Sequence, residues 1–163
     1  MQAKTELIVQ LRIMTAALLA LATSTAATAA DWWFVGGVGG GTPKHSVHFV
    51  DNASIMERGT SRLAWDYQIK KTLDIKGVRK SKNLWSFDCS NRTVKLISWT
   101  NYGNNAKLLD SYTVPSYRQT EEYITPDSIG EFKWKFVCEG LREDTVQLNG
   151  KLPEEAAAIY FRF

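Results

Sequence analysis

The chain has 163 residues and a formal net charge of +3, and 12% of its residues are aromatic. A net charge this close to zero argues against a nucleic-acid-binding protein, which usually carries a concentrated excess of lysine and arginine. The length suits one domain of ordinary size that can bury its own hydrophobic core.

The N-terminal segment resembles a secretory signal peptide. Lys4 and Arg12 form a short positive region, and residues 13–22 form an apolar run. That run is too short for a membrane-spanning helix, which needs about 20 residues. Small residues follow the run, and Ala27-x-Ala29 has the spacing that signal peptidase cleaves. A buried N-terminal helix is the alternative interpretation.

The sequence therefore predicts a cleaved signal peptide over residues 1–30 and a single exported domain over residues 31–163. Because no cysteine follows the apolar run, the protein should carry no lipid anchor and should reside in the periplasm or at the cell surface. No later apolar run is long enough for a transmembrane segment.

Short segments of the exported domain have the pattern of β-strands separated by turns. The clearest one places Leu63, Trp65, Tyr67 and Ile69 on one face and polar residues on the other. Gly103-Asn-Asn105 is a strong turn signal later in the chain. Consecutive short strands joined by short turns predict an antiparallel sheet of five to six strands. The predicted strands are residues 32–35, 46–50, 62–72, 84–89, 93–102 and 107–114.

Aromatic side chains could form either core or a binding surface for sugars or proteins. Trp65, Trp85 and Trp99 alternate along predicted strands as core residues do. Trp32 and Trp33 are adjacent and must point to opposite faces of a strand, so one of the two is a candidate for an exposed contact.

The periodicity changes after residue 125, where the sequence predicts a helix that packs on one face of the sheet. Pro126 suits the first helical position, and Ser128 and Glu131 have the spacing of a capping box. Apolar residues then recur at helical spacing, and Gly140 can end the helix.

Cys89 and Cys138 are the only cysteines of the chain. In an oxidising compartment such a pair usually forms a disulfide, which here would tie the predicted helix to the sheet. A redox pair or a metal site is the alternative, but there is no C-x-x-C motif and two cysteines alone cannot form a structural zinc site. The tail, residues 141–163, remains unplaced apart from a possible short helix after Pro153.

Two patterns that suggest ligand sites lack the required spacing. The glycine-rich stretch Gly36–Gly41 fits neither nucleotide-binding loop pattern, so a flexible surface loop is predicted. His45 and His48 are the only histidines, and Asp51 lies close by. A metal site there would need a further ligand, so no metal is predicted.

No sequence motif indicates that the protein is an enzyme. The nucleophile motif G-x-S-x-G is absent, although a triad could assemble from residues far apart in sequence. Asp66 and Glu131 could in principle form an acid–base pair, but nothing distinguishes them from the other acids. The sequence therefore predicts a non-catalytic protein without a cofactor.

A basic segment is the best candidate for a ligand-binding surface. It lies in a predicted long hairpin loop over residues 71–82 and is opposed only by Asp74. Such a cluster can attract an anionic glycan or an acidic protein. An ordinary solvated loop, with lysines that protect a sheet edge from aggregation, would have the same composition. The candidate residues are Lys70, Lys71, Lys76, Arg79, Lys80 and Lys82.

Several short motifs follow one another in order along most of the exported domain. They are Phe49-Val-Asp51 before Ser54-Ile55, Trp65-Asp-Tyr67, Asp88-Cys-Ser-Asn-Arg92, Tyr102-Gly103, and Ile124-Thr-Pro-Asp-Ser128 before Val137-Cys138. This order resembles the surface-adhesin E family of exported bacterial proteins. The chain departs from that family in its glycine-rich stretch, its C-terminal tail and its lack of a lipid-attachment cysteine.

The resemblance implies an antiparallel sheet with a C-terminal helix held by Cys89–Cys138, and a non-catalytic protein some of whose relatives bind host matrix proteins. Together these features predict an α+β fold and an exported, adhesin-like binding module. The alternative is a structural periplasmic envelope protein without a host ligand. Neither the ligand nor the oligomeric state is predicted.

Overall fold

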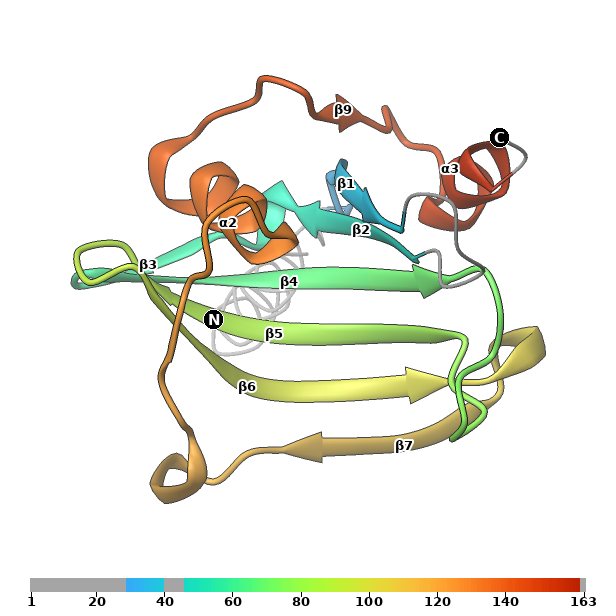
Figure 1. Ribbon diagram of the computed structural model, residues 1–163, viewed down its shortest axis with the longest axis horizontal. Helices are drawn as coiled ribbons and strands as arrows, with labels where there is room; N and C mark the ends of the chain where they lie inside the picture. Colours follow the sequence, from blue (N-terminus) through green and yellow to red (C-terminus); the bar gives the residue numbers. More distant parts are fainter. Residues whose placement is uncertain (1–28, 40–45, 162–163) are drawn as a thin grey trace, which may run out of the picture.

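The computed structural model describes residues 29–39 and 46–161, and nearly all of the predicted signal peptide lies outside them. One antiparallel sheet of nine strands forms the body of the molecule, and helices pack against it (Figure 1). The strands are β1 (Trp32–Val38), β2 (Ser46–Asp51), β3 (Met56–Arg58), β4 (Ser61–Lys70), β5 (Lys80–Asp88), β6 (Thr93–Tyr102), β7 (Leu108–Thr113), β8 (Glu122–Tyr123) and β9 (Val146–Gln147). The helices are α2 (Ile129–Trp134), a π-helical turn that continues it (Lys135–Glu139), and α3 (Pro153–Tyr160).

The strand order is β7-β6-β5-β4-β2-β1-β9, with β3 paired to β4 and β8 paired to β6. Strands β4 to β7 form an antiparallel meander, which confirms the predicted sheet type. The predicted number of five to six strands is wrong. Strands β3, β8 and β9 are two or three residues long, too short for an alternating pattern to reveal them.

The glycine-rich stretch is partly strand. β1 continues through Gly36 and Gly37, so the predicted loop is wrong there, whereas the end of the stretch lies outside the described residues. A Cβ at Gly36 would lie 2.9 Å from Cδ1 of Ile129 in α2, and one at Gly37 would overlap the ring of Tyr160 in α3. These two glycines therefore allow both helices to approach β1 closely.

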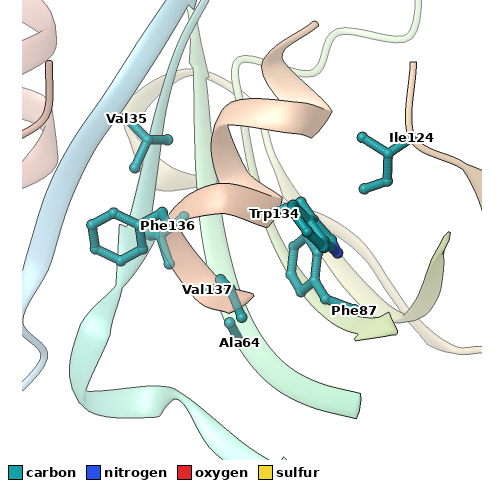
Figure 2. Close-up of a cluster of buried hydrophobic side chains, with 8 residues drawn as sticks. Val35, Ala64, Phe87, Ile124, Trp134, Phe136 and Val137 are labelled. Carbon is teal, nitrogen blue, oxygen red and sulfur yellow. The ribbon is translucent and has the colours of Figure 1, made fainter. Parts of the chain in front are cut away.

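The first part of the core lies between α2 and one face of the sheet (Figure 2). Figure 2 shows Trp134 beside Phe87 and Val137 beside Ala64, whereas Phe136 is directed to the other side of the helical segment, where Val35 lies. Burial of each large apolar side chain contributes about 1.5–3 kcal/mol. The members are Val35, Val50, Ala64, Phe87, Ile124, Trp134, Phe136 and Val137.

The second part of the core lies on the opposite face. Phe49 and Val50 are neighbours on β2, and the alternation of a strand sends them to the two different clusters. Ala157 of α3 and Leu148 of the tail complete the second cluster. The sequence predicts a helix on one face of the sheet only, whereas the structure has a helix on each face. The members are Val47, Phe49, Tyr67, Ile69, Leu148 and Ala157.

The tryptophans follow the predicted alternation only in part. Trp32 and Trp33 do point to opposite faces, but each is half-buried against an aromatic ring of its own cluster, so neither is the exposed contact expected. Trp85 packs against the first cluster. Trp65 and Trp99 are half-buried and belong to neither cluster.

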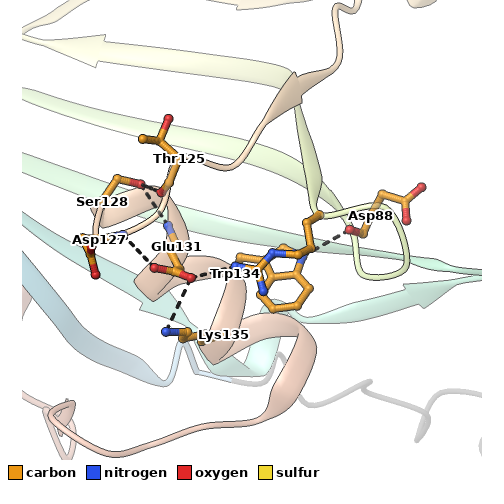
Figure 3. A network of polar contacts seen from close by, with 8 residues as sticks. Asp88, Thr125, Asp127, Ser128, Glu131, Trp134 and Lys135 are labelled. Carbon is orange, nitrogen blue, oxygen red and sulfur yellow. Dashed lines mark hydrogen bonds and ion pairs between the residues drawn. The ribbon is translucent and has the colours of Figure 1, made fainter.

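The start of α2 is set by the predicted capping residues (Figure 3). Ser128 Oγ accepts a hydrogen bond from the Glu131 backbone N–H at 3.3 Å, and the Glu131 carboxylate accepts one from the Asp127 backbone N–H at 2.8 Å. Asp127 has a left-handed φ of 56°. The helix therefore begins at Ile129, and the prediction of Pro126 as the first helical residue is wrong.

The end of the helical segment is fixed to the sheet. Gly140 ends it with a left-handed φ of 69°, and a disulfide joins Cys89 to Cys138 with a Cα–Cα distance of 5.4 Å. The Arg62 guanidinium of β4 also donates hydrogen bonds to the carbonyls of Val137 (2.8 Å) and Cys138 (2.9 Å). The predicted disulfide between helix and sheet is confirmed.

Candidate binding surface

The loop between β4 and β5 is organised by the side chain of Asp74. One carboxylate oxygen accepts hydrogen bonds from the backbone N–H groups of Lys76 and Val78, each at 2.9 Å. The other lies 2.6 Å from Nζ of Lys70. This hydrogen bond from Lys70 is the main reason why the pKa of Asp74 lies below its ordinary value. The loop is thus a folded turn, as expected for an aspartate that accepts from N–H groups ahead of it.

Three of the predicted binding residues belong to strands and not to the loop: Lys70 ends β4, and Lys80 and Lys82 lie in β5. β5 begins at Lys80, so the predicted loop over residues 71–82 is too long. Lys80 Nζ lies 3.0 Å from Oε1 of Glu154 in α3. Lys82 Nζ lies over the Tyr67 ring, 5.1 Å from its centroid. Both lysines therefore help to hold the α3 side of the sheet together.

The remaining cations gather at one end of the sheet. Lys71 and Lys76 are exposed and Arg79 is half-buried. The Arg79 backbone N–H donates to the Tyr102 carbonyl at 2.8 Å, which places the loop beside the β6–β7 hairpin. Figure 1 shows these two connections side by side at one end of the strands.

That hairpin adds a cation that the sequence interpretation missed. Lys107 is exposed in the β6–β7 connection. The turn signal Gly103-Asn-Asn105, together with the meander, could have placed Lys107 beside the basic loop. Lys71, Lys76, Arg79 and Lys107 together form a basic pole at this end of the sheet.

Asp66 is buried between the sheet and α2, although the alternation of polar and apolar residues along β4 predicts that its side chain faces solvent. It is 2% exposed and forms an ion pair with Lys133 of α2. Asn83 and Trp85 donate to its other oxygen at 2.8 and 3.1 Å. Burial alone would raise the pKa of Asp66, but the charge of Lys133 and the hydrogen bonds from Lys133 and Asn83 lower it to about 2.

His48 extends this buried cluster. Its Nε2 lies 3.2 Å from Ser46 Oγ, and its Nδ1 lies 3.9 Å from Asp66 Oδ2. The order Ser–His–Asp resembles a catalytic triad. However, 3.9 Å is too long for a hydrogen bond, and Nδ1 has no partner within the described part of the chain. Burial lowers the pKa of His48. At this distance the Asp66 carboxylate does not hold the imidazole by a hydrogen bond as the aspartate of a catalytic triad does.

The acid pair weighed from the sequence does not assemble. Asp66 is bound to Lys133, whereas Glu131 binds Arg92 at 2.7 Å and Lys135 at 3.5 Å. Figure 3 shows the contact between Glu131 and Lys135. Each carboxylate thus has its own set of partners. Over residues 29–39 and 46–161, no group of three histidine, cysteine or acidic side chains could hold a metal ion. His45 lies outside those ranges.

A family model described as Surface-adhesin protein E matches residues 32–139. The chain belongs to this family. The matched segment runs from the start of β1 to the end of the π-helical turn and includes both cysteines of the disulfide. The structure of crystal form II of Haemophilus influenzae protein E is similar at 12% identity, with a TM-score of 0.43, and the match covers 57% of this chain and 80% of that chain. No curated protein gives a significant match.

Membership of the Surface-adhesin protein E family implies an exported or cell-surface protein and suggests a role without catalysis. Among the helices that the structure describes, none combines the length and the apolar character needed to cross a membrane. The family match ends at residue 139, so β9 and α3 lie beyond it.

Proposed function

We propose that this protein is an exported, non-catalytic binding module whose basic pole docks on an acidic protein surface or an anionic glycan. The proposal rests on the absence of counter-ions. Within the described ranges, none of the ion pairs involves Lys71, Lys76, Arg79 or Lys107. Unpaired cations grouped at one end of a molecule attract and orient an acidic partner.

Apolar side chains beside the basic pole favour a protein as the partner. Leu73 and Ile75 are 44% and 103% exposed, and they flank Asp74, whose side chain fixes the turn. Exposed apolar groups rimmed by charges are typical of protein interaction sites. The surface-adhesin family supports a host or matrix protein as this partner.

Neutralising the basic pole should weaken binding of polyanions and matrix proteins. We expect K71Q/K76Q/K107Q to reduce affinity for heparin and for immobilised matrix extract by about tenfold. The reason is that three exposed charges contribute about 0.5 kcal/mol each. Elution from a heparin column and surface plasmon resonance on matrix extract measure the change.

The matched control is R58Q/R118Q/K151Q. It removes the same charge from exposed residues scattered over β3, the segment after β7, and the tail. If both variants elute at the same salt concentration as the unmodified protein, the basic pole is not the binding surface. If both lose affinity equally, binding depends on net charge alone.

We also propose that residues 1–30 are a cleaved signal peptide and that residues 31–163 form one domain. The protein recovered from the periplasm or cell surface should begin near Asp31 by N-terminal sequencing. Ala27→Lys should block cleavage, because the enzyme needs a small residue there, whereas Ala20→Val should not. An uncut N-terminus in the native protein contradicts the proposal. Protease treatment of whole cells then separates a surface adhesin from a periplasmic structural protein.

A further inference from the structure

The β6–β7 end of the sheet presents an aromatic pair to solvent. Trp99 of β6 and Tyr112 of β7 are cross-strand neighbours. Their ring centroids are 4.9 Å apart and the rings are tilted by 43°. Tyr112 is 41% exposed, and every residue of β7 is exposed. Neither Trp99 nor Tyr112 belongs to either core cluster.

A polar pair lies next to the aromatic pair on the same face. Asn101 and Asp110 are also cross-strand neighbours, two residues along each strand and hence about 6.8 Å from the aromatic pair. Asn101 Nδ2 donates to Asp110 Oδ1 at 2.8 Å, and Ser81 Oγ donates to Asn101 Oδ1 at 2.7 Å. These bonds hold the amide and the carboxylate in fixed positions.

One acceptor of this polar pair remains available. Asp110 Oδ2 accepts no hydrogen bond from residues 29–39 or 46–161, since the bond from Asn101 reaches Oδ1. A hollow of about 320 Å³ lined by Trp99, Asp110, Ser111 and Tyr112 lies beside it. That volume is at the small end of ligand sites, which span about 300–1,000 Å³.

We propose that this surface, formed by Trp99, Tyr112, Asn101 and Asp110, binds a neutral saccharide. The C–H face of a sugar ring carries partial positive charge and can stack on the negative face of an aromatic ring. Its hydroxyl groups can then donate to the free carboxylate oxygen of Asp110, which is an acceptor only. A sugar ring stacked on Trp99 or Tyr112 places the hydroxyl groups at its edge beside Asn101 and Asp110.

The charge of Asp110 selects the class of sugar. A carboxylate without a cation partner in the described residues repels sulfate and carboxylate groups, so sulfated and acidic glycans should be rejected. The saccharide surface therefore differs in chemistry from the basic pole, and separate probes, a neutral trisaccharide and heparin, distinguish binding at the two.

The experiment is isothermal titration calorimetry of the exported domain with maltotriose, cellotriose and chitotriose. At least one should bind with a Kd of about 1 mM, and a heparin-derived sulfated disaccharide should not compete. Tyr112→Ala and Asp110→Asn should each weaken binding by about tenfold. Tyr123→Ala and Asp144→Asn change an exposed tyrosine and an exposed aspartate elsewhere and should leave binding unchanged.

Two results would overturn the proposal. One is that none of the three neutral trisaccharides binds at up to about 10 mM. The other is that the Asp110 and Tyr112 variants, folded by circular dichroism, bind as tightly as the unmodified protein. Should Tyr112→Ala not fold, Asp110→Asn decides alone, because an exposed aspartate to asparagine change preserves shape. Heparin retention of each variant reports separately on the basic pole.

Discussion

Replacing Cys89 and Cys138 with serine is expected to lower the free energy of unfolding by about 4 kcal/mol. The disulfide closes a loop with a sequence separation of 49. Opening that loop gives the unfolded chain additional conformational entropy, and about 4 kcal/mol is the loss that the chain-entropy model assigns to this length. For a domain of this size the melting temperature should fall by about 10–20 °C. Thermal unfolding followed by circular dichroism measures the change.

The reduced protein provides the control for this prediction. Adding a thiol reductant to the unmodified protein should reproduce the lower melting temperature, while the double variant should not respond to the reductant. The Arg62 hydrogen bonds to the end of the helical segment remain in both cases, so the reduced fold should persist at low temperature. A variant that melts within about 2 °C of the oxidised protein would show that the disulfide does not limit stability.

The tail gives the sheet its second covered face. Leu148 and Ala157 lie in the second cluster, and both come after residue 139, where the family match ends. Without them Val47, Phe49 and Ile69 would lose part of their cover. We infer that residues 140–161 are an integral part of the domain, with the close approach of α3 permitted by Gly37.

Local features of the sequence were sufficient to predict much of this fold. The alternation around Leu63 and Tyr67 predicts β4, and the spacing of Ser128 and Glu131 predicts the start of the helix within a few residues. These signals depend on residues that are close together in the chain, so they can be recognised in a single sequence. The disulfide was predictable because two cysteines in an exported protein have one partner each.

Long-range features were not predictable in the same way. Asp66 occupies a polar position in the β4 pattern, yet it is buried because Lys133, far away in sequence, reaches it from α2. The availability of the basic residues also depends on contacts that are distant in sequence. Lys80, for example, is paired with Glu154 of the tail. Lys107 joins the basic pole only through the pairing of strands. Local charge density therefore predicts three members of the basic pole, Lys71, Lys76 and Arg79. The contacts that occupy Lys70, Lys80 and Lys82 depend on the fold.

The buried ion pair should be the most sensitive point of the polar interior. We expect Lys133→Met to lower the free energy of unfolding by about 3–5 kcal/mol, since it leaves the Asp66 carboxylate buried without its cation. Asp66→Asn/Lys133→Met should recover a large part of that loss, because an amide has no charge to compensate and can still bond to Asn83 and Trp85. Urea denaturation at pH 7 measures both values.

The pH dependence of stability distinguishes this explanation from a loss of packing. In the unmodified protein the pKa of Asp66 is lowered to about 2, so its stabilising contribution is present at neutral pH and is lost as the pH falls from about 4 toward 2. Buried His48, with its lowered pKa, also costs stability as the pH falls below about 6.5.

In Lys133→Met the pH dependence of stability that comes from Asp66 should have the opposite sign. An unpaired buried carboxylate has a raised pKa, so uptake of a proton by Asp66, or by His48 beside it, should stabilise the folded variant as the pH falls from 7 toward 5. The free-energy difference between variant and unmodified protein should therefore shrink on acidification. A difference that stays constant from pH 7 to pH 5 would mean that Lys133 stabilises the fold through the packing of its side chain and not through its charge.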